Sequence, residues 1–252
     1  MRNFDAYSRY YDLLYRDKEY SSESEYVYLL LTRYATTEMN TLLELGCGSG
    51  NHARYLSEKG LNITGIERSE EMVTLARSKN IPGFNPTVAD ITDFSLNEQY
   101  DAAVSLFHVI SYLADNTDLL NCFLTTGKHL KLGALFLFDV WYTPAVLEQK
   151  PETRIKRLSD DNILVTRLAE PAINHITNTV DVHYEVWIKE RQSGHVEVFN
   201  EVHPMRHFGI PEIDLLARQT GFELLHSEAF LTGEKPGTNT WGVCFVLKKS
   251  HE

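Results

Sequence analysis

The sequence has few cysteines, and no two of them lie close together in the chain. Among its 252 residues there are three, Cys47, Cys122 and Cys244. Their spacing excludes a Cys-x-x-Cys metal or redox site and disfavours a disulfide framework. A chain of this length buries a core large enough to fold without such cross-links. We therefore expect a protein of a reducing, cytoplasmic compartment.

Long hydrophobic runs are also missing. The longest apolar stretches, such as residues 135–140, have the length of a strand. They fall far short of the roughly 20 residues that cross a bilayer. Residues 1–20 are rich in Tyr, Asp and Arg and lack the apolar centre of a signal peptide. The sequence predicts no association with a membrane.

Positive charge is in deficit. Lys and Arg number 24 against 35 Asp and Glu, so the formal net charge is −11. Contacts to phosphates dominate the affinity for DNA and RNA, so a chain this acidic is a poor candidate for binding nucleic acid. We expect a small-molecule substrate as its partner, and the sequence leaves open whether the chain forms a homodimer.

Strands and helices alternate through the first 150 residues. Short apolar strands are predicted at 41–45, 62–67, 84–89, 101–107 and 133–140. Helices are predicted at 22–33, 51–59 and 117–130, with another that begins after a capping Ser69. Ser22-x-x-Glu25 predicts a capping box for the first helix. This alternation is typical of a parallel sheet that helices cover on both faces.

The pattern changes after about residue 152. Apolar and polar residues alternate at 180–188 and at 196–202, on either side of a turn at 191–194. This period of two is typical of antiparallel hairpins. Further elements are predicted as a helix at 211–220 and strands at 222–231 and 241–248. We expect a single domain, with N-terminal lid helices at 1–35 and an antiparallel insertion at 152–207.

A glycine-rich loop follows the first strand. It reads Glu44-Leu45-Gly46-Cys47-Gly48-Ser49-Gly50-Asn51. Glycines allow a tight turn and a close approach to a ligand, and Glu67 ends the next strand, where an acid can bind the ribose of an adenosine ligand. An NAD-dependent dehydrogenase is one alternative. It is disfavoured because Asn51 stands where the dinucleotide fingerprint has a small residue.

Further motifs fall at the expected places along the chain. They are Gly65-Ile66-Glu67-Arg68-Ser69-x-x-Met72, Ala89-Asp90-Ile91 and Tyr100-Asp101-Ala102-Ala103-Val104-Ser105. Together with the glycine loop, they resemble the motifs of the class I S-adenosylmethionine (SAM) methyltransferases. The resemblance implies an α/β fold with a Rossmann-like, seven-stranded, mostly parallel sheet and helices on both faces. The antiparallel insertion would lie between the fifth strand and the last helix.

The resemblance also implies the cofactor and its binding residues. The cofactor would be SAM, with S-adenosylhomocysteine as its product, and N–H donors of the loop region would meet the methionine carboxylate. The implied cofactor-binding residues are Tyr11, Tyr15, Glu44, Gly46, Cys47, Gly48, Gly50, Glu67, Arg68, Met72, Asp90, Ile91, Leu106 and Phe107.

A finer resemblance concerns the substrate side. The segments that carry it are Tyr10-Tyr11-Asp12-Leu13-Leu14-Tyr15, Lys18-Glu19-Tyr20, Phe107-His108-Val109-Ile110-Ser111-Tyr112-Leu113 and Glu201-Val202-His203 with His207-Phe208. They are similar to the deoxysugar N,N-dimethyltransferases that act on nucleotide-linked amino sugars. Trp141-Tyr142-Thr143-Pro144 is similar to methyltransferases of polysaccharide gene clusters. The implied catalytic residues are His108 and Tyr15, and the implied substrate-binding residues are Tyr112, Asp139, Trp141 and Arg206.

Each of these residues has a plainer interpretation. His108 follows a strand end, where a histidine suits a general base, but a hydrogen-bonded loop histidine fits equally well. Tyr11 and Tyr15 belong to a helical stripe of tyrosines, and Trp141 suits a core. Local basic residues that suit a diphosphate are Arg154, Lys156, Arg157 and Arg167.

No metal site is expected. His203 and His207 are four residues apart, but Pro204 disfavours a regular helix between them, and no carboxylate or cysteine completes a ligand set. The sequence thus favours a SAM-dependent methyltransferase that acts on an amine or hydroxyl of a small molecule, with a nucleotide-linked sugar as one candidate. The alternatives are another small-molecule O-methyltransferase and a SAM-binding regulatory protein without turnover.

Overall fold

The computed structural model describes residues 13–251. Its main sheet has the order β3-β2-β1-β4-β5-β11-β10. The strands are β1 (Thr41–Leu45), β2 (Asn62–Glu67), β3 (Phe84–Val88), β4 (Tyr100–Ser105), β5 (Leu130–Tyr142), β10 (Phe222–Ala229) and β11 (Gly242–Lys249). The first five strands are parallel, and β11 runs antiparallel to both of its neighbours. The predicted seven-stranded, mostly parallel sheet is confirmed.

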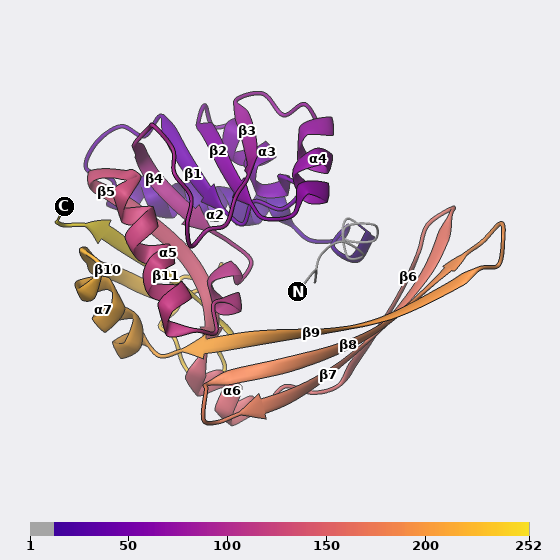
Figure 1. Ribbon diagram of the computed structural model, residues 1–252. Coiled ribbons are helices and arrows are strands. Elements are labelled where there is room, and N and C mark those ends of the chain that lie inside the picture. The colour runs from indigo at the N-terminus through magenta and orange to yellow at the C-terminus, as the bar shows by residue number, and fades with distance from the viewer. Residues whose placement is uncertain (1–12, 252) are drawn as a thin grey trace.

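Helices cover both faces of this sheet (Figure 1). In chain order they are α2 (Tyr20–Tyr34), α3 (Asn51–Ser57), α4 (Glu70–Ser78), the 3₁₀ helix η1 (Val109–Tyr112), α5 (Asn116–Lys128), α6 (Thr143–Gln149) and α7 (Ile210–Gln219). In the described part of the chain, no helix is both long and apolar enough to span a membrane.

The parallel strands are buried on both sides because successive side chains point to opposite faces. Leu42 packs with α2 and α3 in one core, whereas its neighbour Leu43 packs with α5 and α7 in the other. Leu137 and Phe138 divide in the same way on β5. Apolar residues at consecutive positions therefore build two cores, one on each face.

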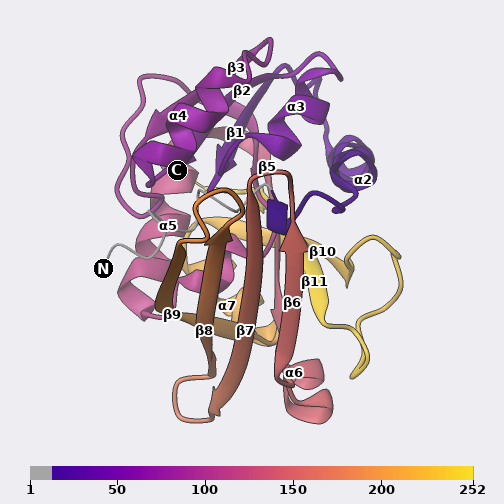
Figure 2. The ribbon, with the colours of Figure 1, turned by 90° about the vertical axis from the view of Figure 1, so that its right-hand side faces the viewer.

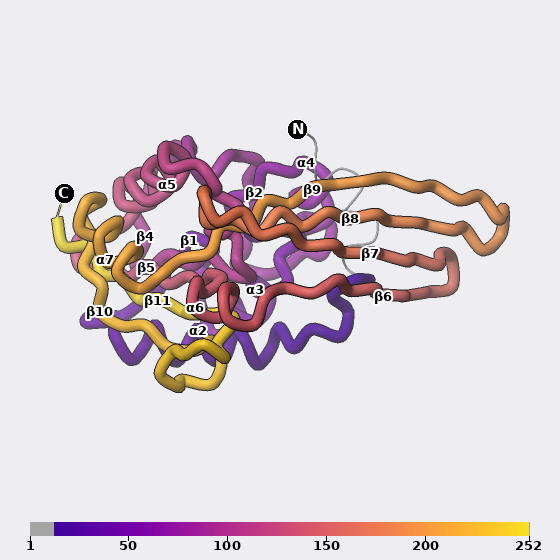
Figure 3. The backbone as a smooth tube through the Cα atoms, turned by 90° about the horizontal axis from the view of Figure 1, so that it is seen from below, coloured from indigo at the N-terminus to yellow at the C-terminus, as the bar shows by residue number. Residues whose placement is uncertain are grey.

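The insertion is a four-stranded antiparallel sheet that extends away from the main sheet (Figures 1 and 3). Its strands are β6 (Arg154–Ser159), β7 (Ile163–Asn174), β8 (Thr179–Glu190) and β9 (Val196–Phe208). The end of β9 pairs in parallel with the end of β5, through Trp141 with His207 and Tyr142 with Phe208. This junction joins the two sheets into one of 11 strands and fixes the insertion beside the carboxyl end of β5.

One face of the insertion sheet points toward residues 13–19, which precede α2 and which we call the N-terminal segment. We refer to this face of the sheet as the inner face. Val165, Val186 and Ile188 on this face pack against Leu14. Figure 2 shows the short indigo segment before α2 beside β6 and β7. The Lys156 ammonium also donates a hydrogen bond to the carbonyl oxygen of Leu14. By contrast, α2 packs on the main sheet as part of its core. The boundaries predicted for the lid and the insertion as units stay predictions.

Local signals account for some element ends and fail at others. Ser69 caps α4 as predicted, because its hydroxyl accepts a hydrogen bond from the Met72 N–H at 3.2 Å. The capping box at Ser22 is wrong, since α2 begins at Tyr20 and its N-cap residue, Glu19, makes no capping side-chain bond. The short helix α6 has Pro144 in its first turn, a common position for proline, and the sequence interpretation missed it.

Candidate active site

The glycine loop joins the end of β1 to the start of α3. Gly46, Gly48 and Gly50 all have positive φ angles, of 70°, 53° and 78°. A Cβ added to Gly46 would lie 2.7 Å from the Val109 side chain, and one added to Gly50 would lie 2.6 Å from the Phe84 ring. The backbone angles disfavour larger residues at all three positions, and space also excludes them at Gly46 and Gly50, so the turn itself requires these glycines.

The N–H groups of this loop mostly bond within the protein. Those of Gly46 and Cys47 both donate to the Ile66 carbonyl, at 2.8 and 3.1 Å, and that of Gly50 donates to the Cys47 carbonyl. The Gly48 N–H donates to Glu67. Three of these donors, at Gly46, Cys47 and Gly48, hold the loop against β2, and the fourth closes a turn within the loop. The expectation that loop N–H groups receive a carboxylate does not hold for them.

Glu67 ends β2, as the sequence predicted, and its carboxylate points at the loop. Its Oε2 accepts the Gly48 N–H at 3.1 Å, and its Oε1 accepts the Ser69 N–H at 2.9 Å. Burial raises the pKa of Glu67, while the two N–H donors oppose that effect. A carboxylate oxygen has a second lone pair, so this geometry leaves Glu67 able to accept hydrogen bonds from a ligand.

Glu44 is a buried carboxyl group near the end of β1, with 2% of its surface exposed. Within residues 13–251, its Oε2 has no hydrogen-bond partner. Burial, together with the negative charge of Glu67, raises the pKa of Glu44 to about 8. A buried acid of this kind would be stabilised by a cationic ligand group.

Asn51 has a structural partner that explains why it differs from the small residue of the dinucleotide fingerprint. Its Oδ1 accepts a hydrogen bond from the Lys79 ammonium at 2.8 Å, and the Ser49 hydroxyl accepts another from the same ammonium at 2.9 Å. Lys79 follows the last turn of α4. The loop is thus anchored from the far end of the next helix.

The segment after β4 has an unusual backbone. Phe107 and His108 are consecutive non-glycine residues with positive φ angles, of 65° and 61°. Such conformations cost energy and are concentrated at functional sites. They direct the chain into η1, whose Ser111 hydroxyl accepts the Trp141 N–H at 3.1 Å. The loop is therefore fixed to β5.

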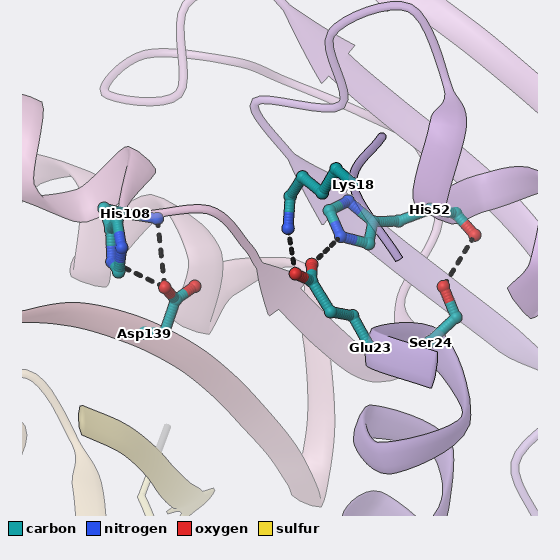
Figure 4. A network of polar contacts seen from close by, with 6 residues as sticks. All are labelled: Lys18, Glu23, Ser24, His52, His108 and Asp139. Atoms are coloured by element: carbon teal, nitrogen blue, oxygen red, sulfur yellow. Dashed lines mark hydrogen bonds and ion pairs between the residues drawn. The ribbon is translucent and has the colours of Figure 1, made fainter. Parts of the chain in front are cut away.

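His108 is paired with Asp139 of β5 (Figure 4). The imidazole Nδ1 lies 2.6 Å from Asp139 Oδ2, and the backbone N–H of His108 donates to the same oxygen at 3.2 Å. Burial acts to raise the pKa of Asp139, but the charge and hydrogen bonds of His108 lower it below the ordinary value. A carboxylate oxygen this close to Nδ1 favours the proton on that nitrogen, and a neutral His108 then presents its lone pair on Nε2.

A second cluster connects the N-terminal segment with α3 (Figure 4). Glu23 pairs with the Lys18 ammonium and with His52 Nε2, the latter at 2.8 Å. The same ammonium lies 4.5 Å from the centre of the Phe107 ring. Sequence reasoning missed the pairing of Glu23 with His52, although Lys18 and Glu23 both fall in the predicted lid. The cluster holds that segment beside the glycine loop and the loop after β4.

Aromatic rings connect several of the predicted residues. Tyr15 packs edge-on against Phe107, with ring centres 4.9 Å apart. His108 in turn packs against Trp141 at 6.3 Å, and Trp141 joins Tyr112 in one apolar cluster. The structure therefore brings these five residues together at the carboxyl ends of β4 and β5.

The inner face of the insertion adds polar groups beside Tyr112. The Tyr112 hydroxyl is 3.1 Å from His203 Nδ1, and His203 Nε2 is 3.0 Å from Glu201. The Arg167 guanidinium lies over the Tyr184 ring at 4.8 Å. The predicted basic patch divides here, because Lys156 and Arg167 share the inner face, whereas Arg157 alternates to the outer face.

Other predicted site residues have contacts of their own. Arg206 pairs with Glu212 at 2.7 Å and donates to Asn116, so it clamps β9 to α7 and the start of α5. Asp90 is exposed and accepts both the N–H and the hydroxyl of Thr92. The structure does not bring these two together with His108. Tyr11 lies outside the described residues.

The remaining predicted cofactor residues lie around the loop. Leu106, Met72 and Cys47 are buried, Ile91 is partly buried and Arg68 is exposed. Burial, with the charges of Glu44 and Glu67, raises the pKa of the Cys47 thiol, which also packs closely on Gly65. Cys47 thus acts as a small apolar residue that packs the loop on β2.

Comparison with known proteins agrees with this geometry. Residues 42–133 match the family described as "Methyltransferase domain". The chain is 26% identical to YqeM of Bacillus subtilis, a provisionally named methyltransferase, over 98% of this chain and 97% of the relative. It is also 26% identical to a dTDP-3-amino-3,4,6-trideoxy-alpha-D-glucopyranose N,N-dimethyltransferase of Streptomyces venezuelae, over 88% and 92%. The chain therefore contains a methyltransferase domain.

A solved structure shares the fold of this methyltransferase. It is a SAM-dependent methyltransferase from Clostridium acetobutylicum, with a TM-score of 0.81 and 20% sequence identity. The match covers 98% of this chain and 99% of the other. The match therefore includes the insertion as well as the main sheet.

Proposed function

We propose that this methyltransferase transfers the methyl group of SAM to the amine of a nucleotide-linked amino sugar. The observation that carries the proposal is the His108–Asp139 pair at the carboxyl ends of β4 and β5, opposite the basic inner face of the insertion. The Streptomyces venezuelae relative is named for such a substrate, a dTDP-linked amino sugar. A substrate of this kind is a small molecule, and a cytoplasmic location and a homodimer remain compatible with it.

The residues around the glycine loop fit the cofactor. Glu67 would accept hydrogen bonds from the ribose hydroxyls through the lone pairs that the Gly48 and Ser69 N–H groups leave. Glu44, whose buried Oε2 has no partner within the described residues, would face the ammonium of the methionine part. SAM supplies a methyl group already activated on a sulfonium. The protein therefore mainly needs to align the acceptor and exclude water.

His108 would serve as the general base. An amine attacks only after it has lost its proton, and the Nε2 lone pair of His108 is available to take that proton. Asp139 would stabilise the resulting imidazolium through the 2.6 Å contact to Nδ1. In this assignment Asp139 orients the base and does not touch the acceptor, since only 1% of its surface is exposed.

The inner face of the insertion would bind the nucleotide diphosphate. Lys156 and Arg167 are paired across β6 and β7 and share this face. A guanidinium binds phosphate oxygens through two parallel hydrogen bonds, and an ammonium adds a point charge. Tyr15 lies between this face and the loop after β4, since it packs on Phe107 while the Lys156 ammonium lies 5.7 Å from its ring centre.

The experiment is a mass-spectrometric acceptor screen with the purified full-length chain and SAM. The panel contains dTDP-linked amino sugars, the matching dTDP-linked hydroxy sugars and free amino sugars. The proposal predicts a gain of one or two methyl groups on the dTDP-linked amino sugars alone. Methylation of the hydroxy sugars would favour an O-methyltransferase instead. Binding of SAM with no transfer to any acceptor would favour a regulatory protein.

A further inference from the structure

A second imidazole–carboxylate pair lies on the insertion, and it connects to the loop after β4. His203 of β9 has 2% of its surface exposed. Its Nε2 is 3.0 Å from Glu201 Oε2, two residues earlier on the same strand, and its Nδ1 is 3.1 Å from the Tyr112 hydroxyl. Tyr112 ends η1, so the contact joins residues 91 positions apart.

When His203 is neutral, the chemistry of the three groups gives each of the two hydrogen bonds one direction. A carboxylate only accepts hydrogen bonds, so the proton of a neutral His203 lies on Nε2, which donates to Glu201. The Nδ1 atom then has a lone pair, and the Tyr112 hydroxyl must donate its proton to it. As a consequence the Tyr112 oxygen can only accept further hydrogen bonds, because its one proton is already committed.

The surroundings keep Tyr112 a neutral phenol. Burial raises the pKa of Tyr112 well above its ordinary value, and the nearby Tyr15 and Tyr184 hydroxyls add to this effect. The Tyr184 ring packs edge-on against His203, with ring centres 4.8 Å apart. This contact restricts rotation of the imidazole ring. Arg167 of β7 packs over the Tyr184 ring, and its positive charge partly offsets the rise in the pKa of Tyr112.

We propose that Glu201 and His203 hold Tyr112 as an obligate hydrogen-bond acceptor, so that the site selects a methyl acceptor that offers an N–H or O–H donor to this oxygen. This inference rests on the proposed function, since it assigns a further binding residue to the same site. Tyr112 is the specificity-determining residue, and Glu201 and His203 are positioning residues. His108 and Asp139 accept the proton of the reacting group. Tyr112, positioned by Glu201 and His203, binds a different polar group of the acceptor.

Two variants and a control separate this role from a structural one. Tyr112→Phe removes the accepting oxygen, and Glu201→Gln removes the carboxylate that fixes the imidazole proton on Nε2. Tyr100→Phe is the matched control, because Tyr100 lies at the opposite end of β4, where its hydroxyl bonds to Thr64. The steady-state constants are measured with SAM and an amino-sugar nucleotide that is methylated in the screen. Calorimetric titration with S-adenosylhomocysteine is run in parallel.

Tyr112→Phe is expected to raise the acceptor KM about tenfold, the loss expected for one good hydrogen bond, and to leave kcat and S-adenosylhomocysteine affinity nearly unchanged. Glu201→Gln should raise KM severalfold, because the second imidazole tautomer becomes accessible. Tyr100→Phe should leave the acceptor KM at the wild-type value. Parallel losses in KM, kcat and cofactor affinity in Tyr112→Phe would show a structural role and overturn the proposal.

A spectroscopic measurement tests the hydrogen-bond direction without any substrate. Nitrogen-15 NMR of the histidines distinguishes a protonated from an unprotonated ring nitrogen, and the His203 signals are identified by their loss in His203→Gln. The proposal requires a protonated Nε2 and an unprotonated Nδ1 in the wild-type chain at neutral pH. The reverse tautomer would overturn it, whatever the acceptor screen finds. A screen without any product would instead count against the proposed function alone.

Discussion

The Asp139 carboxylate holds His108 at two points, the side chain and the backbone. One oxygen, Oδ2, lies 2.6 Å from His108 Nδ1 and accepts the His108 N–H at 3.2 Å. Because both contacts use the same oxygen, the imidazole plane and the strained backbone of the loop are fixed by one residue of β5. The pair therefore sets the direction in which Nε2 points.

Asp139→Asn tests the general-base assignment. The amide cannot stabilise an imidazolium and permits the other tautomer of His108, so we expect kcat to fall by about 100-fold or more. The affinity for S-adenosylhomocysteine should change little, because Asp139 is not assigned to the cofactor. Steady-state kinetics and calorimetry give the two quantities. An equal loss in both would mean that Asp139 supports the fold of the site and not its chemistry.

Gly242→Ala tests how closely the imidazole must be placed. A Cβ at Gly242, the first residue of β11, would lie 3.2 Å from His108 Cε1, so the ring must shift by a few tenths of an ångström. Small displacements of a catalytic group are costly, and we expect kcat to fall roughly tenfold with no loss of secondary structure. Gly209→Ala is the matched control, since its nearest contact is an ordinary 3.7 Å to Pro211. Equal activity of the two variants would contradict the prediction.

Local sequence signals were sufficient to predict the main sheet and to place the glycine loop and Glu67 at one edge of it. The glycine loop and Glu67 are neighbours because consecutive parallel strands end at the same edge of a sheet, and the hydrogen bond from Gly48 to Glu67 follows from that arrangement. The strand positions could also be predicted, because a strand that is buried on both faces needs a run of apolar residues. These features depend on the order and spacing of residues along the chain.

Contacts between segments that are distant in the sequence could not be predicted from such local signals. Tyr112 meets His203 only because β9 pairs with the end of β5 and brings the insertion to the loop after β4. The capping box at Ser22 failed for a related reason, since packing of α2 on the sheet extends the helix back to Tyr20. The resemblance implied that Arg206 binds substrate, and its contact with Glu212 of α7, which β9 makes possible, was not indicated by the sequence. Tertiary packing determines the Tyr112–His203 contact, the start of α2 and the position of Arg206.

Asp101→Asn should make stability depend less on pH. Asp101 Oδ2 accepts the N–H groups of Asn40 and Thr41, both at 2.9 Å, and Oδ1 pairs with Lys131. Burial acts to raise the pKa of Asp101, but Lys131 and these donors lower it to about 2. A carboxyl group with a lowered pKa stabilises the fold above its unfolded value of about 4, and this contribution is lost as the pH falls toward 2.

We therefore expect Asp101→Asn to lower the free energy of unfolding by about 2 kcal/mol at neutral pH. The difference from the wild-type chain should shrink between about pH 5 and about pH 3, as Asp101 of the wild-type chain becomes protonated. Urea denaturation across this range measures it. A difference that stays constant with pH would show that the ionised form of Asp101 has no special role.

Glu44→Gln tests the proposed contact with the methionine ammonium. In the folded chain without ligand, burial and the charge of Glu67 raise the pKa of Glu44 to about 8, so it is mostly protonated at neutral pH. Since the unfolded value is about 4, the wild-type chain should lose stability as the pH rises between these values, and Glu44→Gln should not. This dependence is measured by denaturation in the absence of ligand.

An ammonium beside Glu44 would favour its ionised form and expel that proton on binding. Calorimetric titration with S-adenosylhomocysteine near pH 7, in buffers of different ionisation enthalpy, counts the protons released. We expect release in the wild-type chain, none in Glu44→Gln, and weaker binding in the variant by roughly tenfold or more, because a hydrogen bond between charged groups is lost. The same proton release in both chains would place the ammonium elsewhere, and Glu44 would then be a buried acid of the β1 end that the cofactor does not touch.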